Sequence, residues 1–372
     1  MGRGVTQGHE HQTARSIPPE NVMKGLIFHG KRDIRCETLD DARIEDDRDV
    51  LVQAKACGIC GSDLHLYHDD FAEIGEGFEL GTGFCVGHEA VGEVVEKGKG
   101  VTQLKIGDTV MLAAMTGCGT CRPCLRGESK QCEQGWSVFG FGIGLGGCQA
   151  ELIRVPAGDY NAARLPDGVT VDQGILLTDN ISTAYGAALG AEIRPGRSVA
   201  IVGLGPIGLM AVELAMIMGA SVVYAIDPVP ERRAIAAGLG AIPVWGDDIP
   251  AQLRDITQGR MIDCIIEAVG GDKTMELALD LVGINGNISI LGVNNSMKFT
   301  IPRQVFVNNA TIRGNFVTEV QKHWPVLVPM LQSGRIRPEQ FITDRRALAE
   351  GPDAYEKFDR REGGTLKAIL YT

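Results

Sequence analysis

The chain has 372 residues and a formal net charge of -11, from 36 Lys and Arg against 47 Asp and Glu. A chain of this length is expected to form two domains. The acidic balance argues against a nucleic-acid partner, because binding phosphates requires clustered Lys and Arg. No apolar run approaches the roughly 20 residues of a membrane-spanning helix, so no membrane partner is expected.

The first 22 residues form a polar segment that contains Pro18 and Pro19. This composition predicts a flexible N-terminal tail. The segment has no apolar stretch behind its Arg residues, so we expect no secretory signal and a cytoplasmic protein. In that setting the ten cysteines of the chain are expected to be thiols or metal ligands rather than disulfides.

Residues 23–166 contain short Val-rich runs interrupted by Gly and Asp, such as DVLVQAKACGIC, EAVGEVVEKG and DTVMLAA. Runs of this kind are typical of short strands joined by turns, and no long helical periodicity accompanies them. We therefore predict an irregular, mostly antiparallel β domain.

From about residue 170 the pattern changes to apolar strands that alternate with helices. Strands without polar alternation are typical of a parallel sheet that helices cover on both faces. The expected strands are 198–203, 222–227, IDCIIEAVG and GNISILGV, and the expected helices are 206–218, 230–241 and KTMELALDLVG. A helix in HWPVLVPMLQSG and a last strand in TLKAILYT follow.

A glycine-rich turn, GLGPIG, directly follows the first of these strands and opens the next helix. Glycines at these spacings allow a tight turn, the approach of a pyrophosphate and close helix–strand packing. The phosphate would lie at the helix N-terminus, where free N–H groups favour an anion. The predicted dinucleotide-binding residues are Gly203, Gly205, Pro206, Ile207 and Gly208.

Asp227 ends the next strand, 19 residues after Gly208. Its carboxylate would accept hydrogen bonds from the adenosine ribose and repel a 2′-phosphate, which predicts NAD rather than NADP. The alternative is a structural turn with an Asp at the strand end. Arg232 and Arg233 follow on the next helix, where they are either exposed helix residues or neighbours of the adenine. We assign Arg232 to the cofactor site.

Four cysteines lie at gaps of two, two and seven residues in the loop 117–133. Three closely spaced thiols and a fourth that returns nearby can form a closed tetrahedral zinc site. The alternative is four free thiols or disulfides. Because thiolates fill every position and leave none for water, the predicted zinc is structural. Its ligands are Cys118, Cys121, Cys124 and Cys132.

A second, looser group begins at CGICGSDLH, which contains Cys60, Ser62 and His65, and continues at GHE, which contains His88 and Glu89. A catalytic zinc takes about three protein ligands and keeps an open position, and Cys60, His88 and a carboxylate could supply them. Spacing alone also allows a satisfied His–Glu polar pair.

The chain resembles the zinc-dependent medium-chain alcohol dehydrogenases over essentially its whole length after about Met23. The motifs are GICGSDLH (58–65), GHEAVGEV (87–94), GDTV (107–110), the four-cysteine loop and GLGPIG (203–208). The resemblance implies an α/β chain with a GroES-like, irregular β catalytic domain built from both chain ends and a doubly wound Rossmann domain inserted in it. It also implies a homodimer or a homotetramer. The expected division is 1–22 (tail), 23–181 (catalytic β domain), 182–315 (NAD-binding domain) and 316–372 (C-terminal part of the catalytic domain).

The resemblance also implies the ligands of a catalytic zinc. It places Cys60 and His88 on the metal and Glu89 beside it, as a close or alternating ligand. In the family the later ligand is a Cys or an Asp, and LLTDNISTAYG offers Asp179 and no cysteine. We therefore predict that Asp179 is the third ligand. The alternative is that it caps a helix that begins near Ser182.

The implied reaction is hydride transfer between an alcohol, or its aldehyde or ketone, and NAD. Zinc would act as a Lewis acid on the substrate oxygen, and the resemblance places a proton relay on Ser62 and His65. The alternative from another class is a non-catalytic zinc- and NAD-binding protein, such as a redox sensor. The open coordination position and the two relay residues argue against it.

The sequence does not define the substrate beyond a small alcohol or carbonyl compound. A long segment separates His65 from His88, and in this fold it would border the substrate, with charged residues that are either functional or solvated. Aromatic residues could line an apolar pocket or belong to the core. These residues are His68, Asp69, Asp70, Glu73, Glu76 and Cys85 in the segment, and Phe84, Trp136, Phe139, Phe141 and Phe316 among the aromatics.

Overall fold

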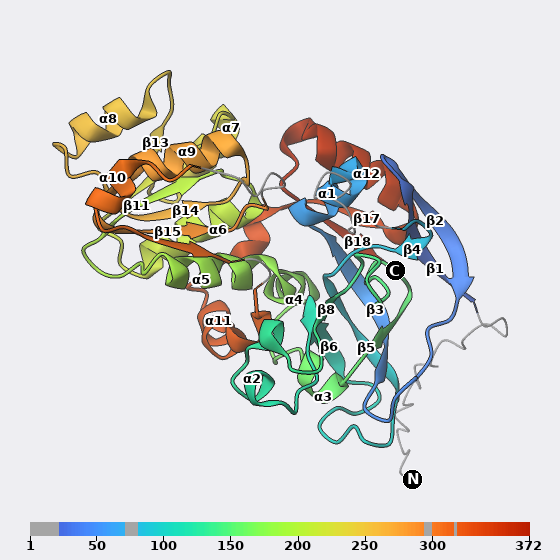
Figure 1. The fold of residues 1–372 in the computed structure, drawn as a ribbon. Helices are drawn as coiled ribbons and strands as arrows, with labels where there is room; N and C mark the ends of the chain where they lie inside the picture. Colours follow the sequence, from blue (N-terminus) through green and yellow to red (C-terminus); the bar gives the residue numbers. More distant parts are fainter. Residues whose placement is uncertain (1–21, 71–80, 294–299, 316–317) are drawn as a thin grey trace, which may run out of the picture.

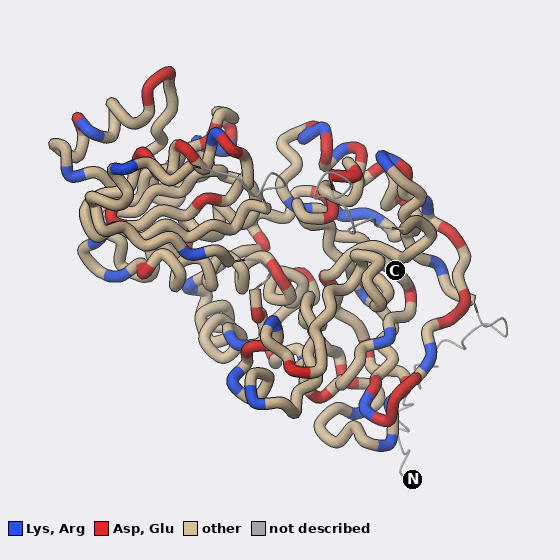
Figure 2. Tube along the Cα trace, in the orientation of Figure 1, with Lys and Arg blue, Asp and Glu red and all other residues tan. Residues whose placement is uncertain are grey.

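The computed structural model describes residues 22–70, 81–293, 300–315 and 318–372, which form two sheet-based units (Figure 1). Residues 1–21 of the predicted tail 1–22 lie outside these residues, as do Glu73, Glu76 and Phe316, whereas Val22 begins strand β1. In the described part of the chain no helix is long and apolar enough to cross a bilayer. Figure 2 shows Lys and Arg scattered among Asp and Glu along the trace, rather than gathered in one stretch.

The first unit is built on a sheet with the strand order β10-β6-β5-β3-β18-β17, and β9 also pairs with β3. The C-terminal strand β18 runs antiparallel to β3, with Leu370 opposite Cys57, so distant parts of the chain complete one sheet. Because β3 lies at the centre of the sheet, it is buried along most of its length. The strands are β3 (Val50–Ile59), β5 (Ala90–Lys97), β6 (Thr109–Leu112), β9 (Leu152–Val155), β10 (Ala162–Arg164), β17 (Ile342–Ala347) and β18 (Lys367–Tyr371).

Smaller elements surround this sheet. A three-stranded sheet contains β2 (Asp33–Asp40), β1 (Val22–Gly30) and β4 (Phe84–Cys85), and β7 (Met115–Thr116) pairs with β8 (Ser137–Val138). The helices are α1 (Gly61–His68), α2 (Arg122–Leu125), α3 (Gly158–Asn161), α4 (Val171–Thr178), α11 (Trp324–Gln332) and α12 (Gly351–Arg360). Helix α5 (Asn180–Gly190) follows α4 and packs against the second unit. The short 3-10 turns are η2 (Ser129–Gln131), η3 (Val320–Lys322), η4 (Pro338–Phe341), η5 (Leu348–Glu350) and η6 (Glu362–Gly364).

The second unit is a parallel sheet with the strand order β13-β12-β11-β14-β15-β16. Alternate residues of β11 face two separate cores: Val199 and Ile201 pack in one, and Ala200 and Val202 in the other. This two-sided burial explains the wholly apolar strands and confirms a doubly wound fold. The strands are β11 (Ser198–Val202), β12 (Val222–Ile226), β13 (Ile242–Val244), β14 (Ile262–Glu267), β15 (Val282–Ile290) and β16 (Thr311–Gly314). The helices are α6 (Pro206–Ile217), α7 (Pro230–Gly238), α8 (Ile249–Ile256), α9 (Asp272–Leu281) and α10 (Arg303–Val307).

The strands and helices expected in the parallel sheet are all present, but several other elements were not anticipated. The motif GSDLHLYH forms the helix α1 rather than a turn between strands. Helices α4 and α5 precede the sheet, and the predicted boundary between residues 181 and 182 lies inside α5. Since α4 packs against β3 and β5 while α5 packs against α6 and β15, the junction of these two helices lies where the two sheet-based units meet.

Candidate zinc and cofactor sites

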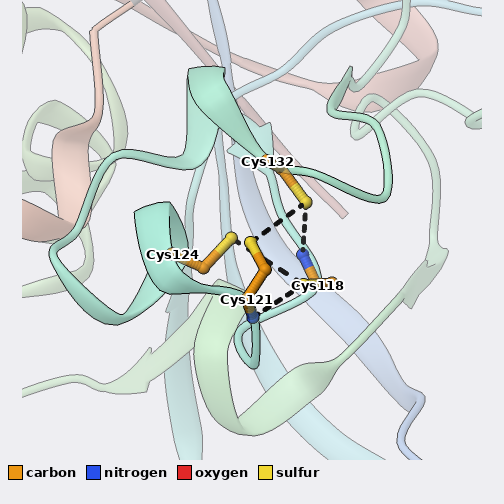
Figure 3. Close-up of side chains that lie close together, drawn as sticks. All are labelled: Cys118, Cys121, Cys124 and Cys132. Carbon is orange, nitrogen blue, oxygen red and sulfur yellow. Dashed lines mark hydrogen bonds between the residues drawn. The ribbon is translucent and has the colours of Figure 1, made fainter.

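The four cysteines of the loop converge on one point (Figure 3). The Sγ atoms of Cys118 and Cys124 are 4.0 Å apart, and those of Cys121 and Cys132 are 3.9 Å apart. Zn–S bonds of about 2.3 Å in a tetrahedron separate sulfur atoms by about 3.8 Å, so the observed spacing fits zinc. All ten cysteines of the chain lie in described residues and none forms a disulfide.

Hydrogen-bond donors also point at these sulfur atoms. The Sγ of Cys118 accepts from the backbone N–H of Thr120 (3.4 Å) and of Cys121 (3.3 Å), and from the Thr120 hydroxyl (3.5 Å). Burial opposes ionisation of this thiol, but these donors outweigh it and lower its pKa to about 6. A thiolate near neutral pH is the form that binds zinc.

The second group of predicted ligands comes from three separate connections. Cys60 precedes α1, His88 and Glu89 precede β5, and Asp179 joins α4 to α5. Their ligand atoms all lie within 4.8 Å of one another. The sheet pairing of β3 with β5, and the packing of α4 on both strands, bring these connections together.

Two of the distances among these residues are close to those expected around a zinc ion. The Asp179 Oδ2 lies 3.2 Å from the Cys60 Sγ and 3.5 Å from the His88 Nε2. Ligands bound at about 2.0–2.3 Å in a tetrahedron lie about 3.3–3.8 Å apart. Burial and the neighbouring Asp179 carboxylate raise the pKa of the Cys60 thiol to about 11, so ionising it requires a cation nearby.

The carboxylate of Asp179 does not cap the backbone of α5 and directs one of its oxygens at these ligand atoms. Although Asp179 occupies the N-cap position of that helix, its side chain makes no capping hydrogen bond. Its Oδ1 instead accepts from the Thr183 hydroxyl at 2.7 Å, which leaves Oδ2 directed at Cys60 and His88. Burial would raise the pKa of Asp179, but the positive imidazole of His88 holds it well below its usual range.

Asp63 contacts two of the predicted ligands, which the sequence did not reveal. Its Oδ2 accepts from the Cys60 backbone N–H at 2.9 Å, and its Oδ1 lies 3.1 Å from the His88 Nδ1. With Nδ1 held toward a carboxylate, Nε2 is the nitrogen available to a metal. The aromatic ring of Phe141 lies against the His88 ring, with centroids 5.5 Å apart.

Glu89 forms a buried ion pair with Lys367, which the sequence also did not reveal. Its Oε2 pairs with the Lys367 ammonium, which also donates to the Ile59 carbonyl at 2.9 Å, and its Oε1 accepts from the Asn180 amide at 3.0 Å. Both charged side chains are fully buried. Burial raises the pKa of Glu89, and Lys367 opposes that rise. A Cβ at Gly58 would lie 1.8 Å from the Glu89 Oε2, so only glycine fits there.

The predicted relay residues lie on α1. The Ser62 hydroxyl lies 3.2 Å from the His88 Nε2, so it borders the ligand atoms. His65 is one turn further along the helix, with its Nδ1 2.8 Å from the Asp70 Oδ2. The structure therefore brings Ser62 to the predicted metal ligands and gives His65 a carboxylate partner that the sequence did not indicate.

The other residues considered for substrate contacts differ in their burial and in their partners. Phe139 is fully buried in the core beside β3, and Phe84 packs against Phe28 at 5.5 Å. His68 forms an ion pair with Asp359 of α12. The partly buried Cys85 donates to the Gln149 carbonyl, whereas Trp136 is exposed.

The glycine turn connects β11 to α6, with Gly205 at the N-cap and Pro206 at the first helical position. A Cβ at Gly208 would lie 1.9 Å from the Gly203 carbonyl oxygen, so a side chain there would separate the helix from the turn. Ile207 follows in the first turn of α6. The turn lies at the carboxyl end of β11, between β12 and β14, where doubly wound sheets bind ligands.

Asp227 follows β12 and is buried beside this turn. Its two oxygens accept from the backbone N–H groups of Leu204 and Val229, both at 2.8 Å. Arg232 lies 3.9 Å from the carboxylate, whereas Arg233 donates to the Asp227 carbonyl and stacks over Trp245. Asp227 thus links the glycine turn to the end of the second strand.

Comparisons with known proteins agree with this architecture. Residues 46–167 match the model of the alcohol dehydrogenase GroES-like domain, and residues 206–333 match that of the zinc-binding dehydrogenase family. A protein of Mycobacterium tuberculosis named probable zinc-binding alcohol dehydrogenase is 36% identical over 94% of this chain and 88% of its own length. The sorbitol dehydrogenase of Bacillus subtilis is 30% identical over 95% of this chain and 98% of its own.

A solved structure shows the same fold. The alcohol dehydrogenase of Thermus sp. ATN1 superposes with a TM-score of 0.87, at 37% identity, over 94% of this chain and 99% of its own. Nothing in these comparisons favours the non-catalytic alternative. The chain therefore belongs to the zinc-dependent medium-chain alcohol dehydrogenase family, with a GroES-like domain and a Rossmann domain, and is a zinc-dependent oxidoreductase.

Proposed function

We propose that this chain is an NAD-dependent dehydrogenase that interconverts a small alcohol and its aldehyde or ketone at a zinc ion held by Cys60, His88 and Asp179. The observation that carries the proposal is the convergence of these three ligand atoms beside the Ser62 hydroxyl. When bound, zinc supplies a Lewis acid that lowers the pKa of a hydroxyl group.

The chain's own residues would position the reactants and move the proton. The turn Gly203–Gly208 and the N-terminus of α6 would bind the pyrophosphate of NAD. Ser62 would accept the alcohol proton and pass its own proton toward His65, whose side chain is 24% exposed and can release it to water. Glu89 would stay on Lys367 when substrate is bound and approach the metal otherwise.

The test of this function is a panel of primary and secondary alcohols, polyols and their carbonyl partners, assayed with NAD and with NADP by absorbance of the reduced cofactor. We expect turnover of at least one class, with NAD preferred. Cofactor binding without turnover across the panel, at full zinc content, would favour the non-catalytic alternative.

The cofactor preference is expected to depend on Asp227. Replacing Asp227 with Gly removes the charge that would repel a 2′-phosphate, so kcat/KM with NADP should rise relative to NAD by about tenfold or more. The measurement is the ratio of the two kcat/KM values. Because the carboxylate also accepts from Leu204 and Val229, circular dichroism should first verify that the variant is folded. A wild-type enzyme that uses both cofactors equally would contradict this role.

We expect two zinc ions per chain, one in each group of ligands. The substitution Cys118→Ser should remove the zinc of the four-cysteine loop and lower the melting temperature, because three thiolates hold zinc less well than four. Cys36→Ser, at a partly buried thiol of β2, is the control and should keep both ions. One zinc per wild-type chain that persists in a folded Cys118→Ser protein would contradict the loop site.

We also propose that the protein is a cytoplasmic homodimer or homotetramer. The convergence of four cysteines in one group of possible metal ligands, which requires reduced thiols, supports a reducing compartment. Apolar side chains on α10 support association, since Phe306 is 85% exposed and Val307 is 57% exposed. Light scattering of the purified protein measures the number of chains.

A further inference from the structure

The C-terminal end of α1 places a carboxylate against the imidazole of His65. We propose that Asp70 is a positioning residue for proton transfer: it orients the His65 ring and stabilises its protonated form while the alcohol proton leaves. This inference rests on the proposed function, because it assigns a partner to the relay residue of the same site.

The backbone conformation at the end of α1 brings Asp70 next to His65. Asp69 adopts a left-handed backbone conformation (φ 59°), and its N–H donates to the carbonyls of His65 and Leu66. The chain therefore reverses immediately after the last helical residue, and the next side chain returns to the helix. As a result, the Asp70 Oδ2 lies 2.8 Å from the His65 Nδ1.

This contact fixes which nitrogen of His65 can act as a base. A carboxylate accepts only, so the proton of a neutral His65 stays on Nδ1 and the lone pair is on Nε2. Ser62 stands three residues earlier on α1 and thus on the same face of the helix. Its hydroxyl lies 3.2 Å from the His88 Nε2, beside the ligand atoms.

The proton transfer balances with the redox step. The alcohol carbon loses a hydride, with its electron pair, to the nicotinamide, and the hydroxyl proton moves to the Ser62 oxygen. Ser62 gives its own proton to the Nε2 of His65, and the imidazolium later releases a proton to water. The Asp70 carboxylate compensates the positive charge of the intermediate imidazolium.

A second His–Asp pair on the same helix provides a comparison. The His68 Nε2 lies 2.7 Å from the Asp359 Oδ1, and Asp359 also pairs with Arg32 at 3.3 Å, so that pair ties α1 to α12 and to the turn after β1. Asp70, in contrast, pairs with a residue of the helix that it directly follows. Because the His65–Asp70 contact is so local, it contributes little to holding two elements together. We therefore infer that its main effect is to orient the His65 ring.

The described charged residues near His65 can be replaced one at a time by mutation. On its own segment they are Asp63, which faces His88, and His68, Asp69 and Asp70. From the elements packed against α1 the described charged groups include Glu356, Asp359 and Arg360 of α12 and Arg32 beside β1. The carboxylate of Asp70 lies within hydrogen-bond distance of the His65 ring.

The test compares Asp70→Asn with Asp359→Asn in the zinc- and NAD-loaded enzyme, each alone and combined with His65→Gln. We expect Asp70→Asn to lower kcat about tenfold, which is part of the roughly 10²–10⁴ that a positioned acid–base group contributes. Asp359→Asn should leave kcat unchanged, and Asp70→Glu should recover much of the rate.

The double variants decide whether Asp70 acts through His65. In the His65→Gln background, Asp70→Asn should have no further effect on kcat, whereas a purely structural role would slow both backgrounds by the same factor. The tautomer of the His65 ring, read from its nitrogen NMR signals, is an independent readout, and the Nδ1–H form should be less populated in Asp70→Asn. An unchanged tautomer, or an active wild-type enzyme whose Asp70→Asn variant is unchanged, overturns this inference alone. An inactive wild-type enzyme would contradict the proposed function itself.

Discussion

Replacing Asp179 with Ala is expected to remove the catalytic zinc and lower turnover on the order of 10³-fold, with the loop zinc retained. The substitution deletes the oxygen that lies 3.2 Å from the Cys60 Sγ and 3.5 Å from the His88 Nε2, so two strong ligands remain. Losing the Lewis acid costs several kcal/mol of transition-state stabilisation, and each 1.4 kcal/mol is about tenfold in rate. Zinc content per chain and kcat measure the two effects.

Two further substitutions separate the ligand role of Asp179 from the helix-cap alternative. Serine is a good N-cap and a poor zinc ligand, whereas cysteine is a zinc ligand and a poor cap. If Asp179 binds zinc, Asp179→Cys should retain the second ion and Asp179→Ser should lose it. If it only caps α5, Asp179→Ser should keep full activity, and Asp179→Ala should cost about 1 kcal/mol of stability without loss of metal. The absence of a capping hydrogen bond in the structure favours the first outcome.

Features confined to one short segment of sequence could be predicted well. The four cysteines lie within one loop, and the glycine turn directly follows its strand, so their spacing alone constrains their geometry. Asp63 also left a local signal, since it lies three residues after Cys60 and accepts the N–H at the start of α1. A carboxylate three residues after a helix start is a familiar capping arrangement, but its second contact, with His88, depends on the fold.

Features that depend on pairing between distant strands could not be predicted. Lys367 meets Glu89 across 278 residues of sequence, and it does so only because β18 runs beside β3. In the sequence, Lys367 is a single charge at the start of an apolar C-terminal strand, and nothing there indicates its partner.

The Lys367–Glu89 pair also changes the balance of charges around the predicted zinc. Cys60 and Asp179 can neutralise a zinc ion, while Glu89 is balanced by Lys367 rather than left in excess.

Removing the Lys367 charge is expected to destabilise the fold strongly. In Lys367→Met the fully buried Glu89 carboxylate would lose its cation, and breaking one side of a buried pair costs about 3–5 kcal/mol. Lys55→Met is the matched control, because Lys55 pairs with Glu93 at 2.9 Å on the surface of the same sheet and such pairs contribute about 0–1 kcal/mol. Urea unfolding of both variants measures the difference.

The double variant Glu89→Gln with Lys367→Met tests whether charge or packing causes the loss. The neutral amide in place of the Glu89 carboxylate would keep the shape of the side chain and could still accept from Asn180, while the methionine fills most of the volume of the lysine stem. If the unpaired charge is the cause, the double variant should recover most of the lost stability, because no buried ion is then left without a partner. If Lys367 acts mainly by packing and by donating to Ile59, removing the Glu89 charge should recover nothing, and the two losses would add.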